Sequence, residues 1–244
     1  MLERAFDEYT SNYDLNNSMI KSKYNHSYRV MHLCEKYAKE LGWSKSDILL
    51  ARIIGLLHDF GRFEQYKVYK SFKDKETIDH ADYSVEQLFD KGLITKFTRR
   101  KKDYEIIKFA IENHNKIGIP KCDDERKIRF AKLIRDADKV DIMYLLGDGN
   151  EIKEKGKDEL ISDEVFKCIK KHTLIPHTIT NNYNDRIVVQ FAFVFDLNYD
   201  VVLSDYKKNL KGFYKQVEYN NIFKDIYEEV NKYIDERMKV DVRN

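Results

Sequence analysis

Residues able to bind a metal ion stand at positions where the surrounding sequence is apolar and has a helical period. They are His26, His58, Asp59, His80, His114 and Asp138. Burying an unpaired ionised group on a helix face is strongly unfavourable, so residues of this kind at buried positions should have a partner that compensates their charge. Imidazoles and carboxylates together suit a divalent ion such as Mn, Fe, Ni, Co or Zn, and Mg becomes less favoured as imidazoles accumulate.

Each residue also has a simpler interpretation. A single histidine on an apolar face is more often a hydrogen-bonded core residue than a ligand. An inward aspartate such as Asp138 could instead pair with a neighbour such as Arg135. The adjacent His58 and Asp59 are harder to explain without an ion, because both end a buried helix. The joint occurrence of six such residues favours a metal site.

Helices must position these residues, and the period of apolar side chains predicts them. Apolar residues at steps of three and four predict helices over residues 24–41, 48–57, 80–90, 103–114 and 123–146. The sequence "SKSD" before the second helix offers capping side chains. Residues 59–79 show no steady period and are interpreted as a long loop, a kind of segment that is usually functional.

The sequence after residue 147 predicts an extension. We expect a charged connection, a helix near 163–171, an apolar segment at 187–197 that could be helix or strand, and a terminal amphipathic helix around Ile222–Ile234. The predicted fold class is all-α. Its domains are a core over residues 1–146 and a mostly helical extension over 147–244 packed on that core.

The composition excludes several classes of protein. With 44 basic and 42 acidic residues the net charge is +2, so nothing global indicates a nucleic-acid partner. The longest apolar stretch, "IVVQFAFVF", is far shorter than the roughly 20 residues of a membrane-spanning helix. The beginning of the chain lacks the apolar core of a signal peptide. Three dispersed cysteines form no CxxC pair, so we expect a reducing, cytoplasmic location.

The order of the candidate ligands resembles that of the HD superfamily of metal-dependent phosphohydrolases, an all-helical fold. The resemblance covers about residues 20–146. It rests on a first histidine followed by "SYRV", on "LLHD" at the end of an apolar helix, and on a later aspartate in "RDADKVD". By this resemblance, the first ion would be held by His26, His58, Asp59 and Asp138.

Members with two ions carry further histidines between the HD doublet and the final aspartate. His80 in "DHADYS" and His114 in "ENHNK" match those positions, so the resemblance implies two ions bridged by Asp59. The stretch "HNKIGIP" resembles the H…GYP loop of the branch that cleaves cyclic-di-GMP. Ile119 replaces its tyrosine and the doubled histidine is absent, which argues against that activity.

Arg62 in "HDFGR" is the candidate for contacting a phosphate oxygen, where many members carry lysine. A guanidinium fork matches that geometry, although an ion pair with Glu64 or Asp59 would explain it equally well. Lys139 is a weaker candidate of the same kind. Aromatic residues of segment 59–79 could stack a nucleobase or simply pack against the core.

The expected function is hydrolysis of a phosphate ester of a small molecule, most plausibly a nucleotide, by a monoesterase or diesterase. Two-metal chemistry lowers the pKa of a shared water, which attacks in line while the ions hold the phosphoryl oxygens. The proposed catalytic residues are Asp59 and Arg62. The alternatives are a metal-containing module that senses a nucleotide without turnover, and a helical scaffold without metal. The sequence indicates no oligomeric state.

Overall fold

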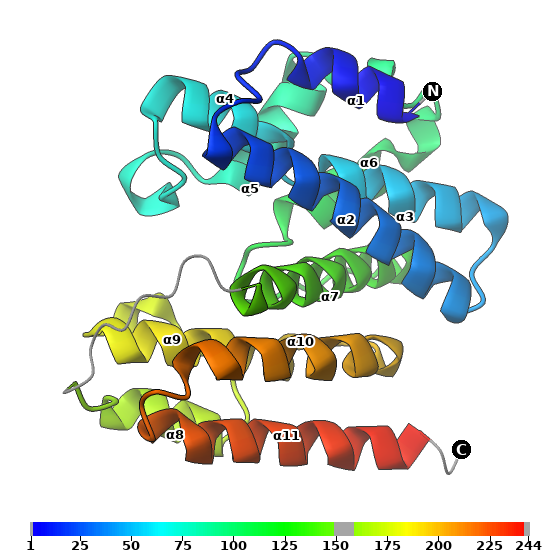
Figure 1. Ribbon diagram of the computed structural model, residues 1–244. Helices are drawn as coiled ribbons and strands as arrows, with labels where there is room; N and C mark the ends of the chain where they lie inside the picture. The colour runs from blue at the N-terminus through cyan, green and yellow to red at the C-terminus, as the bar shows by residue number, and fades with distance from the viewer. Residues whose placement is uncertain (1, 149–158, 242–244) are drawn as a thin grey trace. The chain divides into compact units, whose positions relative to one another are not determined.

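The computed structural model describes residues 2–148 and 159–241 (Figure 1). Contacts between Cα atoms divide the chain into two units, Met1–Ala137 and Asp138–Asn244. All regular structure in the described ranges is helical, which confirms the predicted all-α class. No helix in these ranges combines the length and the apolar composition needed to cross a bilayer.

The first unit consists of helices of very different length. Its α-helices are α1 (Leu2–Thr10), α2 (Ser18–Glu40), α3 (Lys45–Leu57), α4 (Phe60–Tyr69), α5 (His80–Val85), α6 (Tyr104–Glu112) and the beginning of α7 (Glu125–Gly147). A π-helical turn (Glu86–Asp90) prolongs α5, and short 3₁₀ turns cover Asp74–Glu76, Leu93–Lys96 and Lys101–Asp103. The predicted helices are therefore present, with shifted ends.

Helices α2 and α3 form the framework of the first unit and lie side by side (Figure 1). Asn17 caps α2 by accepting from the backbone N–H groups of Met19 and Ile20, and Ser44 caps α3. A Cβ atom on Gly55 would lie 2.9 Å from the Cα atom of Met31, so glycine permits this close approach. The contact fixes the middle of α2 against the end of α3.

The prediction of a long loop over residues 59–79 is wrong, because residues Phe60–Tyr69 form α4. Phe60 and Phe63 are fully buried, but Gly61 and Gln65 share the buried side of this short helix. Because a glycine and a glutamine take positions on the buried side, the apolar residues of this segment do not recur with the period of a helix. Only His58 and Asp59 separate α4 from α3.

Helices α4 and α5 pack closely at Gly61. The Gly61 N–H donates to the Ser84 hydroxyl at 2.8 Å, and this hydroxyl donates to the carbonyl of His80 at 2.7 Å. A Cβ atom at position 61 would lie 2.7 Å from the backbone nitrogen of Ser84. The backbone of α4 therefore sets the position of the first turn of α5.

Charged contacts attach α7 to the rest of the first unit. Asp47 in α3 accepts from Arg126 at 2.6 Å and from Arg129 at 2.5 Å. Arg135 is buried and donates to the carbonyls of Asn113 and Lys116, at 2.7 and 2.6 Å. These bonds satisfy backbone groups beyond the end of α6 and hold the segment that contains His114.

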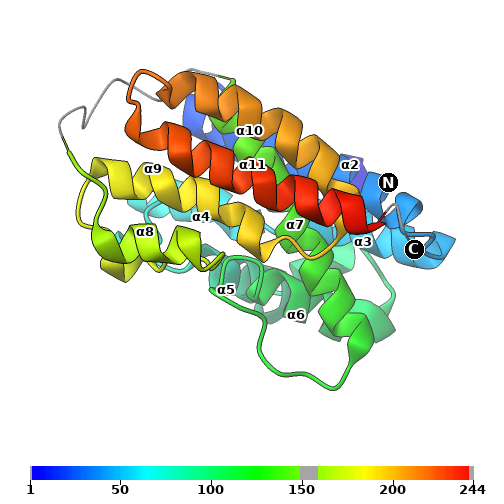
Figure 2. The same ribbon diagram turned by 90° about the horizontal axis from the view of Figure 1, so that it is seen from below.

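The second unit contains the remainder of α7 and α8 (Asp163–Lys170), α9 (Tyr183–Ala192), α10 (Leu203–Val217) and α11 (Ile222–Asp241), with 3₁₀ turns at His177–Ile179, Phe193–Asp196 and Asp200–Val202. Helices α10 and α11 lie side by side in both views (Figures 1 and 2). The ambiguous segment 187–197 is helical. Most of the predicted charged connection after residue 147 lies outside the described residues.

The apolar stripe predicted for α7 needs a correction beyond Ala137. Steps of three and four along the predicted helix 123–146 give the inward stripe Ile128, Ala131, Ile134, Asp138, Ile142 and Leu145. Leu145 is instead 37% exposed, whereas Met143 is buried. The buried stripe of α7 therefore continues from Ala137 through Val140 and Met143 and does not include Leu145. The predicted terminal amphipathic helix is confirmed, because Phe223, Ile226, Val230 and Ile234 are buried along α11.

We expect Gly61→Ala to destabilise the protein, because the added methyl group meets backbone atoms of α5 that cannot rotate away. Overpacking of this kind costs about 1–3 kcal/mol. Gly118→Ala is the matched control, since no heavy atom lies within 4 Å of its added Cβ. Urea denaturation should show a lower free energy of unfolding for Gly61→Ala and an unchanged one for Gly118→Ala. Equal stabilities would contradict the close packing at Gly61.

We expect Asp47 to stabilise the fold above acidic pH. Burial acts to raise the pKa of Asp47, but hydrogen bonds from Arg126 and Ser44 lower it below its ordinary value. Its contribution is therefore present above the unfolded pKa and disappears as the pH falls through the folded pKa. Asp47→Asn should cost about 1–2 kcal/mol at pH 7 and almost nothing at strongly acidic pH.

The measurement for Asp47 is urea denaturation at a series of pH values. The exposed Asp90 provides the control substitution Asp90→Asn, which should leave the pH dependence unchanged. If the difference in unfolding free energy between wild type and Asp47→Asn does not vary with pH, the stabilising role of the ionised Asp47 carboxylate is contradicted.

Candidate metal centre

Four segments of the first unit bring five of the six candidate ligands together. Helix α2 carries His26, and the junction between α3 and α4 presents His58 and Asp59. Helix α5 begins with His80, and His114 follows the end of α6. All five side chains are buried, with exposed fractions between 0% for His58 and 6% for His80.

The carboxylate of Asp59 lies between two pairs of histidines. Its Oδ2 atom is 3.5 Å from Nε2 of His26 and 3.7 Å from Nε2 of His58, which we call the first histidine pair. Its Oδ1 atom is 3.3 Å from Nε2 of His80 and 3.8 Å from Nε2 of His114, the second histidine pair. Each oxygen of one aspartate therefore faces a different pair.

Hydrogen bonds on the far side of the rings determine which nitrogen points inward. The Nδ1 atoms of His58 and His114 bond to the carbonyls of Gly55 and Ile111, at 2.8 and 2.7 Å. The Nδ1 atom of His80 bonds to a carboxylate at 2.5 Å. In a neutral ring that donates from Nδ1, the Nε2 atom carries the lone pair.

These lone pairs require a positive charge between them. The Nε2 atoms of His80 and His114 are 3.0 Å apart, and both face an oxygen of Asp59. Three acceptors converging in a buried space repel one another unless a cation lies among them. Imidazole nitrogens and a carboxylate are suitable ligands for a divalent transition ion. The donor set therefore fits such an ion, and the first histidine pair offers a second set of the same composition.

Lys23 is part of the site and was missed in the sequence. Its ammonium donates to Oδ2 of Asp59 at 2.7 Å. Burial acts to raise the pKa of Asp59, but the charge of Lys23 and contacts with the histidines hold it well below its usual range. Lys23 lies one turn before His26 on α2, but the predicted helix begins at residue 24, so its helical spacing to His26 was not visible in the sequence.

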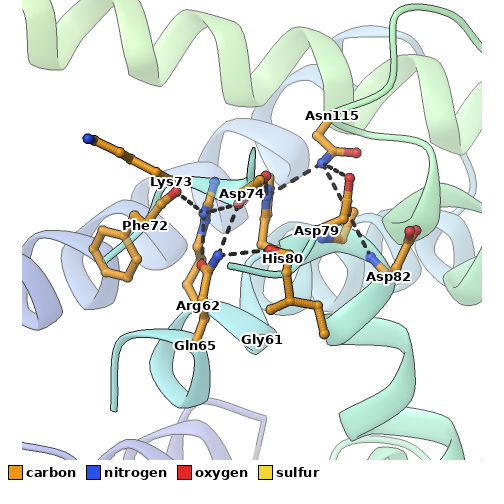
Figure 3. Close-up of polar contacts among 12 residues, drawn as sticks. Gly61, Arg62, Gln65, Phe72, Lys73, Asp74, Asp79, His80, Asp82 and Asn115 are labelled. Carbon is orange, nitrogen blue, oxygen red and sulfur yellow. Dashed lines mark hydrogen bonds and ion pairs between the residues drawn. The ribbon is translucent and has the colours of Figure 1, made fainter. Parts of the chain in front are cut away.

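Asp74 is a second residue that the sequence did not single out. Its Oδ2 atom accepts from Nδ1 of His80, and its Oδ1 atom accepts from Arg62 at 2.6 Å (Figure 3). Burial lowers the pKa of His80 to about 4. Burial acts to raise the pKa of Asp74, but the hydrogen bond from His80 and the charges around it lower that pKa to about 2. At neutral pH a neutral imidazole therefore donates to a carboxylate.

Arg62 lies at the edge of this site. One of its terminal nitrogens contacts Asp74, Gln65 and the carbonyl of Phe72. Its Nε atom lies 3.7 Å from Oδ1 of Asp59 and is buried without a hydrogen-bond partner in the described part of the chain. The ion pair with Asp59 considered from the sequence is thus present, and Asp74 is an additional partner.

The remaining candidates lie beyond the first unit. Asp138 is the first residue of the second unit and continues α7, where it is half-buried. Its role as a ligand stays a prediction. Lys139, the weaker candidate for phosphate contact, is 2.6 Å from Asp196 within the second unit.

We expect the protein to bind two divalent ions and to lose one when both His80 and His114 are replaced by glutamine. Elemental analysis after dialysis against Mn²⁺ or Co²⁺ measures the number of ions per chain. His32→Gln is the matched control, because His32 is exposed on the same helix as His26. Chelation should lower the unfolding free energy, by about 2.7 kcal/mol relative to an ion at 100 times its Kd. An unchanged ion count in the double variant would disprove the second site.

Comparison with known families agrees with this geometry. Residues 24–143 match the model of the family described as HD domain. The comparisons with curated proteins and with solved structures found no match. The matched segment includes the five clustered residues and Asp138, and the resemblance in the order of the motifs is confirmed. The chain therefore contains an HD domain and belongs to the HD superfamily.

Proposed function

We propose that this chain is a divalent-metal-dependent phosphohydrolase that cleaves a phosphate ester of a small molecule. The observation that supports the proposal is the convergence of buried histidine lone pairs on both oxygens of Asp59. Membership of a family rich in metal-dependent hydrolases supports it as well. A helical scaffold without metal would have no need for this arrangement.

In this proposal the two histidine pairs hold two ions. The first pair, with Asp59 and Asp138, would hold one ion, and the second pair would share Asp59 with it. Bound ions would supply a water of lowered pKa and positive charge for the phosphoryl oxygens. The chain itself excludes bulk water by burial and fixes the rings through their Nδ1 bonds.

Two cations of the chain are available for the phosphoryl group. The ammonium of Lys23 and the guanidinium of Arg62 lie 5.9 and 5.6 Å from the ring of Phe72. The buried Nε–H group of Arg62 needs an acceptor, which a phosphate oxygen would provide. Lys23 is 24% exposed and contacts Asp59 directly, so it would attract an anion toward the same carboxylate.

A nucleotide is the finer form of the proposal. Phe60 and Phe63 are fully buried and are not available to stack a base. Phe72 is half-buried beside both cations, and Tyr69 is 46% exposed. Phe72 is therefore the aromatic residue best placed for a base attached to a phosphate. The cytoplasmic location stays a prediction.

The proposal is tested by measuring turnover. Phosphomonoesters and phosphodiesters, including nucleotides, are incubated with wild type, Asp59→Asn and the control Asp90→Asn in the presence of Mn²⁺ or Co²⁺. We expect metal-dependent release of phosphate or alcohol by wild type and the control. Asp59→Asn should fall to background, because the carboxylate that faces both histidine pairs is lost.

The outcome also separates the alternatives. Cleavage of monoesters alone or of diesters as well defines the type of esterase. Tight nucleotide binding without turnover across the whole panel would instead support a sensing module. Absence of both metal and turnover would contradict the proposed function.

A further inference from the structure

We infer that Asp74 is a positioning residue that sets the affinity of the second histidine pair for its ion. The inference rests on the proposed function and concerns the same site. Asp74 lies outside the cluster around Asp59, on a 3₁₀ turn between α4 and α5. It acts through His80, which it contacts on the side of the ring that faces away from Asp59.

The two oxygens of Asp74 have different partners. Oδ2 accepts from Nδ1 of His80 at 2.5 Å, while Oδ1 accepts from Arg62 at 2.6 Å and from Gln65 at 3.1 Å (Figure 3). A carboxylate can only accept hydrogen bonds, so Nδ1 of His80 must carry the proton. The Nε2 atom is then left with the lone pair that ligation requires.

The position of Asp74 is itself held from α4. Arg62 donates to the carbonyl of Phe72 at 2.7 Å, just before Asp74 in the chain. Gln65, which is fully buried, donates to the hydroxyl of Thr77 and to the carbonyl of Ile78, at 2.8 and 2.9 Å. Arg62 and Gln65 are one turn apart on α4, and together they contact both ends of the segment 72–78. Asp74 is therefore oriented by a rigid helix.

The tautomers of the His58 and His114 rings are set by backbone carbonyls instead of a side chain. His58 and His114 bond through Nδ1 to carbonyls within their own helical turn, at Gly55 and Ile111. His80 begins its helix, so no preceding turn can offer it a carbonyl. A side chain from another segment must provide the acceptor, and Asp74 does so. Among these three rings, His80 is the one whose tautomer depends on a replaceable side chain.

Asp74→Asn tests this inference. Asparagine has the same shape, but one of the two acceptors becomes an NH₂ donor. If the amide turns this donor toward His80, Nδ1 must accept, and the proton moves to Nε2, where it blocks ligation. If the amide turns toward Arg62 and Gln65, donors face donors and the segment is loosened. Either orientation should weaken binding of one ion by about 10–100-fold.

Asp79→Asn is the matched control. Asp79 carries the same charge, lies next to His80 and is 2.8 Å from Lys116. Its Oδ1 atom caps α5 by accepting from Ala81 and Asp82, a role that asparagine also performs. The control therefore removes one negative charge beside α5 without removing the acceptor of the His80 ring.

The measurement is titration of the metal-free full-length proteins with Mn²⁺ or Co²⁺ by calorimetry, with His80→Gln as a reference. We expect Asp74→Asn to weaken the same ion that His80→Gln weakens, and Asp79→Asn to bind both ions like wild type. Equal affinities in Asp74→Asn and wild type would overturn the inference. Failure of wild type to bind any ion would instead count against the proposed function.

A second measurement does not depend on any ion. Nitrogen NMR of the imidazole rings distinguishes the proton on Nδ1 from the proton on Nε2. In metal-free wild type and in Asp79→Asn, His80 should carry its proton on Nδ1, whereas in Asp74→Asn a population with the proton on Nε2 should appear. A proton on Nε2 of His80 already in wild type would overturn the inference, even if every variant folds.

Discussion

The buried carboxylate of Asp59 is the constraint on which the first unit depends. An ionised carboxylate without compensation is among the least favourable groups that a protein interior can contain. Lys23 provides one direct ion pair. Histidines on α2, at the start of α5 and after the end of α6 also face the carboxylate. The close packing at Gly55 and Gly61 can be understood from this centre, because each brings a ligand-bearing backbone within reach of Asp59.

Much of the site could be predicted because its ligands contrast with their surroundings. His26, His58 and His114 are polar residues that interrupt or end apolar stripes, and such an interruption is visible in one sequence. The helices that carry them have strong apolar periods, and the capping residue Ser44 of α3 was visible in the sequence, although α2 begins six residues earlier than predicted. Local signals were therefore sufficient for most of the fold of the first unit and for the clustering of these residues.

The parts that were missed depend on tertiary contacts. Asp74 lies in a polar stretch with charged neighbours on both sides, so nothing local separates it from a solvated residue. Its partner Gln65 is polar but fully buried, which also concealed α4. The burial of Met143 and the exposure of Leu145 on α7 also differ from what the local apolar period predicts. Contacts of this kind are determined by the assembled fold.

The two halves of the centre are built from elements of unequal length. The first histidine pair belongs to α2 and to the end of α3, two long helices packed along each other. His80 belongs to α5, which spans only His80–Val85 and continues as a π-helical turn. Short elements open locally at lower free energy than long packed ones. In the proposed two-ion centre, an ion at the His80 side should therefore exchange faster than an ion at the His26 side.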